Sequence, residues 1–403
     1  MKLTNTLFTA AVAALSLTAC GTKDTNSDLE IENKVEALLG KMTLEEKLGQ
    51  MNQLSPWDFD ELAGKVRKGE VGSILNYTDS ALVNKIQRVA VEESRLGIPL
   101  LVSRDVIHGY KTIFPIPLGQ AATFNPQIVE RGARVAAVEA SADGIRWTFA
   151  PMIDISRDPR WGRIAESCGE DPYLTSLMGL AVVKGLQGGG TGKYDKAHAC
   201  AKHYAVHSGP EWNRHSFDAK NISQRDLWET YLPAFKTLVK EGKVKEVMCA
   251  YNRFEGEPCC SNKQLLIRIL REDWGYDDIV VSDCGAIGDF YYPNHHETHP
   301  TAAAASADAV VSGTDLECGG SYSSLNEAVR KGLISEEKIN ESVFRLLRAR
   351  FQLGMFDDDA LVSWSEIPYS VVESKEHVAK ALEMARKSCL LYTSPSPRDK
   401  RQS

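Results

Sequence analysis

The stretch Ile279-Val280-Val281-Ser282-Asp283-Cys284 decides the fold of this chain. Its three leading apolar residues predict a buried strand of a parallel sheet. A serine and an aspartate follow where such a strand would end, and Gly285 allows the chain to turn away. In α/β barrels, polar groups at the C-terminal ends of strands usually carry out the chemistry. For an isolated Asp283, a cap of the next helix would be the favoured role, and the rest of the chain must decide between the two roles.

Helical and strand-like patterns alternate along the chain from residue 30 onward. Thr43 and Glu46 predict a capping box at the start of one early helix. Helices are expected at 35–39, 43–48, 81–94, 126–142, 173–186, 225–241, 263–272, 302–307 and 335–351. Strands are expected at 71–75, 98–102, 146–150, 197–204, 246–251 and 279–282, with a seventh at 309–311. Parallel neighbours need crossover connections, so this alternation predicts an α/β fold with a parallel sheet.

Polar residues recur at the ends of these predicted strands. They are Asp105, Asp154, Lys202, His203, Tyr251 and Asp283. A barrel brings the ends of all its strands to one mouth, whereas an open doubly wound sheet brings together mainly those at its switch point. The spread over many strands therefore predicts a TIM-like (β/α) barrel. Such side chains suit a neutral polyhydroxylated ligand, because charged groups form strong hydrogen bonds to hydroxyls.

The composition is that of an ordinary globular protein, with 43% hydrophobic and 25% charged residues among 403. A net charge of −7 argues against nucleic acid as a partner. Gly188-Gly189-Gly190 is interpreted as a loop rather than a phosphate cradle, since no Lys-Ser/Thr follows. The polar stretch 294–299 contains His295, His296 and His299, and a solvated loop is favoured over a metal site there. No metal or other cofactor is expected.

The N-terminal segment 1–20 has the pattern of a bacterial lipoprotein signal peptide. Lys2 supplies the charged start, residues 7–15 the apolar core and Leu17-Thr18-Ala19-Cys20 the cleavage site, with Cys20 acylated after cleavage. A plain secretory peptide is the alternative. Residues 21–30 are expected to form a flexible tether. The expected protein is exported, periplasmic or anchored to the outer membrane of a bacterium, and only its lipid contacts the membrane.

Eight cysteines remain when Cys20 is set aside. Cys200 and Cys249 lie in apolar strand-like runs and are predicted to be small buried residues rather than bridged ones. The sequence contains no Cys-x-x-Cys pair and no Cys/His zinc spacing. The spacing fixes no disulfide connectivity.

Eight short motifs occur in a fixed order along the chain. They are Lys41–Lys47 (KMTLEEK), Asp105–Gly109 (DVIHG), Phe114–Gly119 (FPIPLG), Ala150–Asp154 (APMID), Arg157–Arg163 (RDPRWGR), Gly169–Pro172 (GEDP), Lys202–Tyr204 (KHY) and Val281–Asp283 (VSD). With these motifs, residues 30–390 or so resemble the N-terminal half of glycoside hydrolase family 3.

The resemblance implies retaining hydrolysis of β-linked glycosides, with an oligosaccharide or aryl glucoside as substrate. Asp283 matches the family's nucleophile, which forms a glycosyl-enzyme that water then releases. Tyr251 lies where the family has a tyrosine near the nucleophile. Met248 is interpreted either as a pocket wall or as a core residue. The residues that match those holding the hydroxyls of the terminal sugar are Asp105, Arg163, Lys202 and His203.

The resemblance also implies a second domain. In the family, the acid/base carboxylate usually comes from an α/β sandwich domain after the barrel. Residues 31–372 are expected to form the barrel, 373–391 the start of a truncated sandwich domain, and 392–403 a non-native tail. The chain is therefore expected to be an N-terminal fragment that lacks its acid/base residue. His207 and His215 lie nearby but are interpreted as loop residues.

Two halves of the chain imply different sugars. Asp105 matches family glucosidases, whereas the family's xylosidases tend to carry Glu there, so we expect a preference for terminal β-D-glucosyl residues. Residues from about 196 to 390 resemble the bacterial β-xylosidases of the family, which makes β-xylosidase the alternative. A non-catalytic glycan-binding lipoprotein is the competing function from another class.

Overall fold

The structure, a computed structural model, describes residues 25–56, 58–188 and 193–389. The predicted signal peptide with Cys20, the glycines Gly189 and Gly190 and the predicted tail 392–403 lie outside the described residues. Lipidation of Cys20 therefore stays a prediction.

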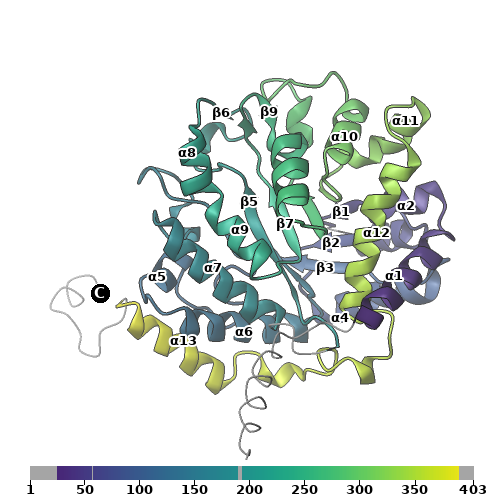
Figure 1. Ribbon diagram of the computed structural model, residues 1–403. Coiled ribbons are helices and arrows are strands. Elements are labelled where there is room, and N and C mark those ends of the chain that lie inside the picture. Colours follow the sequence, from purple (N-terminus) through teal and green to yellow (C-terminus); the bar gives the residue numbers. More distant parts are fainter. Residues whose placement is uncertain (1–24, 57, 189–192, 390–403) are drawn as a thin grey trace, which may run out of the picture.

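Eight strands within the described residues form a parallel sheet at the centre of the molecule (Figure 1). They are β1 (Asn52–Leu54), β2 (Ser73–Leu75), β3 (Leu101–Arg104), β4 (Trp147–Thr148), β5 (His198–Tyr204), β7 (Glu246–Cys249), β10 (Ile279–Ser282) and β11 (Glu317–Cys318). Each pairs with the next along the chain, and β11 pairs with β1. The circle closes where Val281 pairs with Leu316 and the Ser282 amide donates to the Leu316 carbonyl at 2.9 Å. The predicted TIM-like (β/α) barrel is confirmed.

Helices surround this barrel, and a small three-stranded sheet lies beyond its C-terminal end (Figure 1). The small sheet consists of β6 (Asp218–Ala219), β8 (Arg253–Phe254) and β9 (Glu257–Pro258). The α-helices are α1 (Thr25–Leu39), α2 (Leu44–Gln50), α3 (Phe59–Arg67), α4 (Ser80–Arg88), α5 (Pro117–Ala121), α6 (Pro126–Ala142), α7 (Pro172–Gln187), α8 (Gln224–Asp226), α9 (Pro233–Lys240), α10 (Ala302–Val311), α11 (Leu325–Arg330), α12 (Glu336–Gln352) and α13 (Lys375–Lys387). Segments of π-helix continue α4 at Val89–Glu93, join α8 to α9 at Leu227–Tyr231 and precede β10 at Gln264–Asp273.

The helix starts follow capping signals in the sequence. The Thr43 side chain accepts the Glu46 amide and the Glu46 side chain accepts the Thr43 amide, which confirms the predicted capping box. The long helices α6 and α7 each begin with a proline that follows a capping side chain, Asn125 or Asp171. These two helices pack against each other, and α7 also contacts β5.

Arg350 joins the last barrel helix, α12, to the N-terminal ends of two early strands. Its side chain is fully buried. Nε donates to the Pro99 carbonyl at 2.8 Å and Nη2 donates to the Gly72 carbonyl at 2.6 Å. Burial lowers the pKa of Arg350 to about 9. Because Gly72 precedes β2 and Pro99 precedes β3, one side chain holds three elements together.

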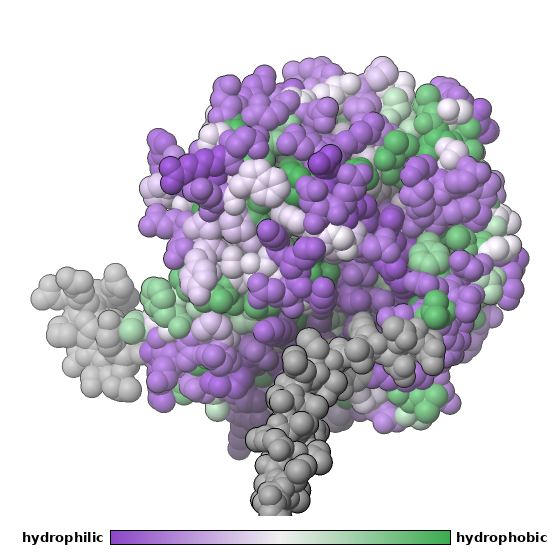
Figure 2. Space-filling view, viewed as in Figure 1, coloured by the Kyte–Doolittle hydropathy of each residue, from purple (hydrophilic) through white to green (hydrophobic). Residues whose placement is uncertain are grey.

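The outer surface is mostly hydrophilic on the face shown in Figure 2, whereas apolar strand residues such as Trp147 and Val281 are buried in the core. Within residues 25–56, 58–188 and 193–389, every helix is too short or too polar to cross a bilayer.

The sequence expectations are wrong at the edge where the barrel closes. Residues 309–311, predicted as a seventh strand, are the last turn of α10, and the strand is instead β11. The alanine-rich run before residue 309 favours helix, while β1 and β11 are too short and polar to give an apolar strand pattern. At the N-terminal side, α1 begins at Thr25, so part of the predicted tether 21–30 is helical.

Two disulfides lie at the ends of strands, Cys249–Cys260 and Cys284–Cys318. The prediction that Cys249 is unbridged is therefore wrong, whereas Cys200 is a buried free thiol as predicted. Cys249 ends β7, and its partner follows the antiparallel pair β8–β9, which turns the chain back. An apolar strand pattern carries no information about a partner that a later turn brings close.

Candidate active site

The sequence-predicted polar residues meet at the C-terminal mouth of the barrel. Asp105 directly follows β3, Lys202 and His203 lie near the end of β5, and Asp283 directly follows β10. Tyr251 comes two residues after β7. The C-terminal ends of parallel barrel strands all open on one side, which explains why residues so far apart in sequence lie together.

Lys202 forms an ion pair with Asp105 across the mouth. Its Nζ atom donates to Oδ1 of Asp105 at 2.6 Å. The lysine side chain is 4% exposed, whereas the aspartate side chain is 42% exposed. The buried lysine thus fixes a carboxylate that a ligand can still reach.

The imidazole of His203 lies between two aspartates. Nδ1 is 2.7 Å from Oδ2 of Asp154, and the same carboxylate accepts the His203 backbone amide at 3.1 Å. Nε2 is 3.5 Å from Oδ2 of Asp283. Burial, and then the charge of Arg163, lowers the pKa of His203 well below its ordinary value. Because Asp154 holds Nδ1, Nε2 is the ring nitrogen that faces Asp283.

Asp283 has one satisfied and one unsatisfied carboxylate oxygen. Oδ1 accepts the Cys284 amide at 2.8 Å, while Oδ2 is buried and accepts no hydrogen bond from the described residues. The Tyr251 hydroxyl donates to the Cys284 carbonyl at 2.9 Å and so fixes the turn after the carboxylate. Burial raises the pKa of Asp283, and the nearby charges of Arg163 and Lys202 oppose that rise. A buried carboxylate oxygen without a partner is rare and points to a role toward a ligand.

Arg163 is held by Glu166, a residue that the sequence did not single out. Nε and Nη2 of Arg163 each donate to one Glu166 oxygen at 2.8 Å. Burial alone would raise the pKa of Glu166, but this paired hydrogen bond lowers it below its ordinary value. The spacing of three residues was visible in the sequence, yet such a spacing is common and no helix pattern marked it.

Met248 lies in β7 between Lys202 of β5 and Val281 of β10, which are its partners in the sheet register. The residue is 3% exposed and belongs to the main core cluster. The position fits both sequence interpretations, so a wall contact with a ligand stays a prediction.

A second layer of residues around the mouth was missed or set aside at the sequence level. His207 is buried, its Nδ1 lies 3.0 Å from Oδ1 of Asn252, and its ring centroid lies 4.9 Å from that of His203. Burial lowers the pKa of His207 to about 4. Glu211 accepts Trp161 Nε1 at 3.3 Å. These contacts join loops after β4, β5 and β7, and only the fold brings them together.

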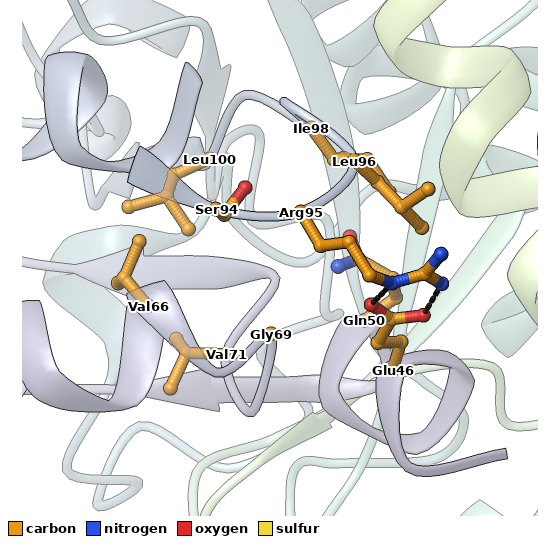
Figure 3. A pocket seen from close by; sticks show the side chains of 10 residues that line it. All are labelled: Glu46, Gln50, Val66, Gly69, Val71, Ser94, Arg95, Leu96, Ile98 and Leu100. Carbon is orange, nitrogen blue, oxygen red and sulfur yellow. Dashed lines mark hydrogen bonds and ion pairs between the residues drawn. The ribbon is translucent and has the colours of Figure 1, made fainter. Parts of the chain in front are cut away.

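A pocket shown in Figure 3 lies away from this mouth. Glu46 and Arg95 form an ion pair on one of its sides, and Val71 and Leu100 line it just before β2 and β3. It therefore opens at the N-terminal end of the barrel. None of the predicted site residues lines it.

A closed barrel whose C-terminal mouth gathers carboxylates, Arg163, Lys202 and His203 defines a (β/α)-barrel protein with a site for a polar ligand. The chain belongs to glycosyl hydrolase family 3, since the profile described as "Glycosyl hydrolase family 3 N terminal domain" matches residues 43–349. The family resemblance seen in the sequence is thereby confirmed.

Named relatives include both glucosidases and xylosidases. The chain is 45% identical to a xylan 1,4-beta-xylosidase of Xylanibacter ruminicola, over 85% of this chain and 42% of that protein. It is 34% identical to a periplasmic beta-glucosidase of Salmonella typhimurium, over 89% of this chain and 47% of that protein. The crystal structure of a beta-glucosidase from Listeria innocua in complex with glucose matches with a TM-score of 0.80 at 33% identity, over 89% of this chain and 51% of that one. The chain spans about half the length of the curated relatives it matches.

Proposed function

We propose that this chain carries the barrel half of a retaining β-glycosidase that removes terminal non-reducing β-D-glucosyl residues from β-glucosides and oligosaccharides. The observation that carries the proposal is the buried, unpartnered Oδ2 of Asp283 at the barrel mouth. Family membership supports the reaction class.

In the proposed mechanism, Oδ2 of Asp283 attacks the anomeric carbon of the sugar. The bond from that carbon to the leaving oxygen breaks, and the oxygen takes a proton from an acid. A water molecule, deprotonated by the same group, then releases the sugar from Asp283. Since the relatives are about twice as long as this chain, we assign the acid to the part of the protein that corresponds to their second half.

Four residues are proposed to bind the hydroxyl groups of the terminal sugar. Asp105 and Lys202 form an ion pair with a reachable carboxylate, and Arg163 is oriented by Glu166. His203 presents Nε2 beside Asp283. Tyr251 is proposed to keep the turn after Asp283 in place, and Met248 to form part of the pocket wall.

The preference for glucosides rests on Asp105. Its carboxylate can accept hydrogen bonds from the 4- and 6-hydroxyls of glucose together, whereas the extra methylene of a glutamate would fill the space of the hydroxymethyl group. β-Xylosidase is the second candidate, and the 45% identity to a xylan 1,4-beta-xylosidase favours it. A glycan-binding protein without catalysis is the third.

Export is also proposed rather than established. The charged start, apolar core and Leu17-Thr18-Ala19-Cys20 of the N-terminal segment support a lipoprotein signal, and one relative is named a periplasmic enzyme. The proposed location is the periplasm or the outer membrane of a bacterium.

Covalent trapping tests the function with little dependence on an acid. A 2-deoxy-2-fluoro-β-glucoside with an activated leaving group needs little protonation, and its fluorine slows hydrolysis of the glycosyl-enzyme. Incubation with the 403-residue chain should add one fluoroglucosyl group, and peptide mass spectrometry should find it on Asp283. The matching fluoroxyloside should label more slowly.

Each other outcome counts against part of the proposal. Faster labelling by the xyloside would favour β-xylosidase. Labelling of another carboxylate would remove the role of Asp283. Glucose binding without any labelling, in calorimetry, would favour the non-catalytic protein.

A further inference from the structure

Three side chains from two loops meet at the rim of the mouth. His215 lies in the segment between β5 and β6, Asp289 in the short helical turn Gly288–Phe290 after β10, and His295 in the loop that follows. His215 Nδ1 lies 2.9 Å from one Asp289 oxygen, and His295 Nδ1 lies 2.5 Å from the other. One potential ligand atom from each residue falls within 4.8 Å of the other two.

Asp289 is the buried centre of this cluster. Its side chain is 3% exposed, and among the described residues it forms ion pairs with these two histidines and with no lysine or arginine. A buried carboxylate is costly unless it is paired with a charge or coordinates a metal. Both partners of this carboxylate are histidines, the side chains that most often bind metal ions.

The cluster has the ligand types of a transition-metal site, and its potential ligand atoms lie within 4.8 Å of one another. Zinc binds histidine nitrogen and carboxylate oxygen at about 2.0–2.2 Å, so neighbouring ligand atoms around it lie roughly 3 Å apart. His215 Nδ1 lies 2.9 Å from one Asp289 oxygen and His295 Nδ1 lies 2.5 Å from the other, so small side-chain shifts would place the three ligands around one ion. Two histidines with one carboxylate leave coordination positions open, and His215 and His295 are 41% and 32% exposed at the side chain, which gives an ion a route of entry.

We propose that His215, Asp289 and His295 bind one divalent transition-metal ion, with Zn²⁺ as the best match and water in the open positions. The sequence favoured a solvated loop at 294–299, because His215 comes from a different loop, 74 residues before Asp289. The ion would join the loops after β5 and β10.

This ion is positioned to brace the mouth rather than to act on a substrate. The His215 ring packs on Tyr251 with centroids 4.8 Å apart, and Tyr251 fixes the turn after Asp283. The competing description has no metal. In it, Arg214 Nε donates to His215 Nε2 at 3.3 Å and the Nδ1 proton goes to Asp289. Metal binding at Nδ1 would leave the ring proton on Nε2, so the weak contact from Arg214 Nε to His215 Nε2 would break. Arg214 would keep its 2.6 Å bond to Glu211.

Metal titration of the chelator-treated 403-residue chain decides between the two descriptions. Calorimetry with ZnCl₂ should give one site per chain with a Kd below about 1 µM. His215→Gln and His295→Gln should each weaken binding at least tenfold, a loss typical of altered metal sites. His299→Gln is the matched control, because His299 belongs to the same loop but pairs with Asp308, and it should bind as the unmodified chain does.

Three further measurements separate a lost ligand from a lost fold. Each variant without metal should keep the circular dichroism of the unmodified chain, and Zn²⁺ should raise the Tm of the unmodified chain but not that of His215→Gln. Co²⁺ should give visible absorption bands that the His215 variant lacks. Absence of a site in the unmodified chain, or equal binding by a folded His215→Gln, would overturn the proposal.

Discussion

Nε2 of His203 lies 3.5 Å from Oδ2 of Asp283. Asp154 holds the opposite nitrogen of the ring, which fixes the direction in which Nε2 points. The imidazole and the carboxylate therefore face one small space at the mouth. A sugar hydroxyl entering that space can form a hydrogen bond with the imidazole while its carbon neighbour approaches the carboxylate, which links sugar binding to the proposed attack.

The most direct test replaces the proposed nucleophile. Asp283→Asn in the full-length protein should lower kcat on an aryl β-glucoside by roughly 10³-fold or more, because the amide cannot form the glycosyl-enzyme. The thermal unfolding transition should stay within a few degrees. Near-normal turnover in this variant would eliminate the assignment.

The cations around Asp283 set its ionisation and therefore the acid side of the pH profile. The carboxylate must be ionised to attack, and Lys202 opposes the rise in its pKa that burial causes. Lys202→Gln should raise the pKa of Asp283 further, so the acid limb of kcat/KM should move to higher pH. Lys202→Arg keeps the charge and serves as the control, so the acid limb of its kcat/KM profile should lie near that of the unmodified protein. If the acid limb of Lys202→Gln does not move to higher pH, the electrostatic account is wrong.

The sugar preference is expected to depend on one methylene group. The unmodified full-length protein should favour the aryl β-glucoside over the β-xyloside, because the xyloside leaves an acceptor of Asp105 unpaired. Such a loss costs roughly 1.5–3 kcal/mol, or about one to two decades in kcat/KM. Asp105→Glu should shift the ratio toward the xyloside. If the unmodified protein prefers the xyloside, the predicted glucoside preference is wrong. If Asp105→Glu leaves the ratio unchanged, the proposed role of the Asp105 side chain is wrong.

The Cys284–Cys318 bridge is expected to contribute to stability. It closes a loop across 34 residues, and a loop of that length corresponds to about 3–4 kcal/mol of unfolding free energy. Replacing both cysteines by alanine should lower the midpoint of urea unfolding accordingly. Cys168→Ala, at a buried free thiol, gives a matched control without a bridge. A double variant as stable as the control would show that the bridge adds nothing.

The barrel could be predicted because its strands and helices are marked by short, local sequence patterns. Apolar runs such as 279–281 and the amphipathic helices between them have clear periods, and strand-end residues such as Asp283 follow from position alone. β1 and β11 could not be predicted, since polar residues such as Asn52, Gln53 and Glu317 interrupt any apolar run there, whereas the equally short β2 and β4 lie in apolar runs. The run at 309–311 was misread because three apolar residues fit either a strand or the end of α10.

The site residues that could be predicted from local patterns lie on strands or just after them, whereas those that were missed lie on loops. Lys202 and His203 stand on a strand whose direction the sequence reveals. Glu166, the partner of Arg163, and the cluster around Asp289 depend on loops whose paths no local pattern fixes. The same holds for the partner of Cys249, which approaches only after a later turn.

Arg350 has a consequence for the timing of synthesis. Arg350 lies 251 residues after Pro99, whose carbonyl accepts its hydrogen bond. β3, which follows Pro99, therefore leaves the ribosome long before the side chain that holds the start of this strand. At about 5–20 residues per second, that interval is roughly 10–50 s. During it, the nascent chain has several strands but no complete ring. We therefore expect the early strands to stay open to chaperones, and the barrel to become resistant to protease only once α12 has been made.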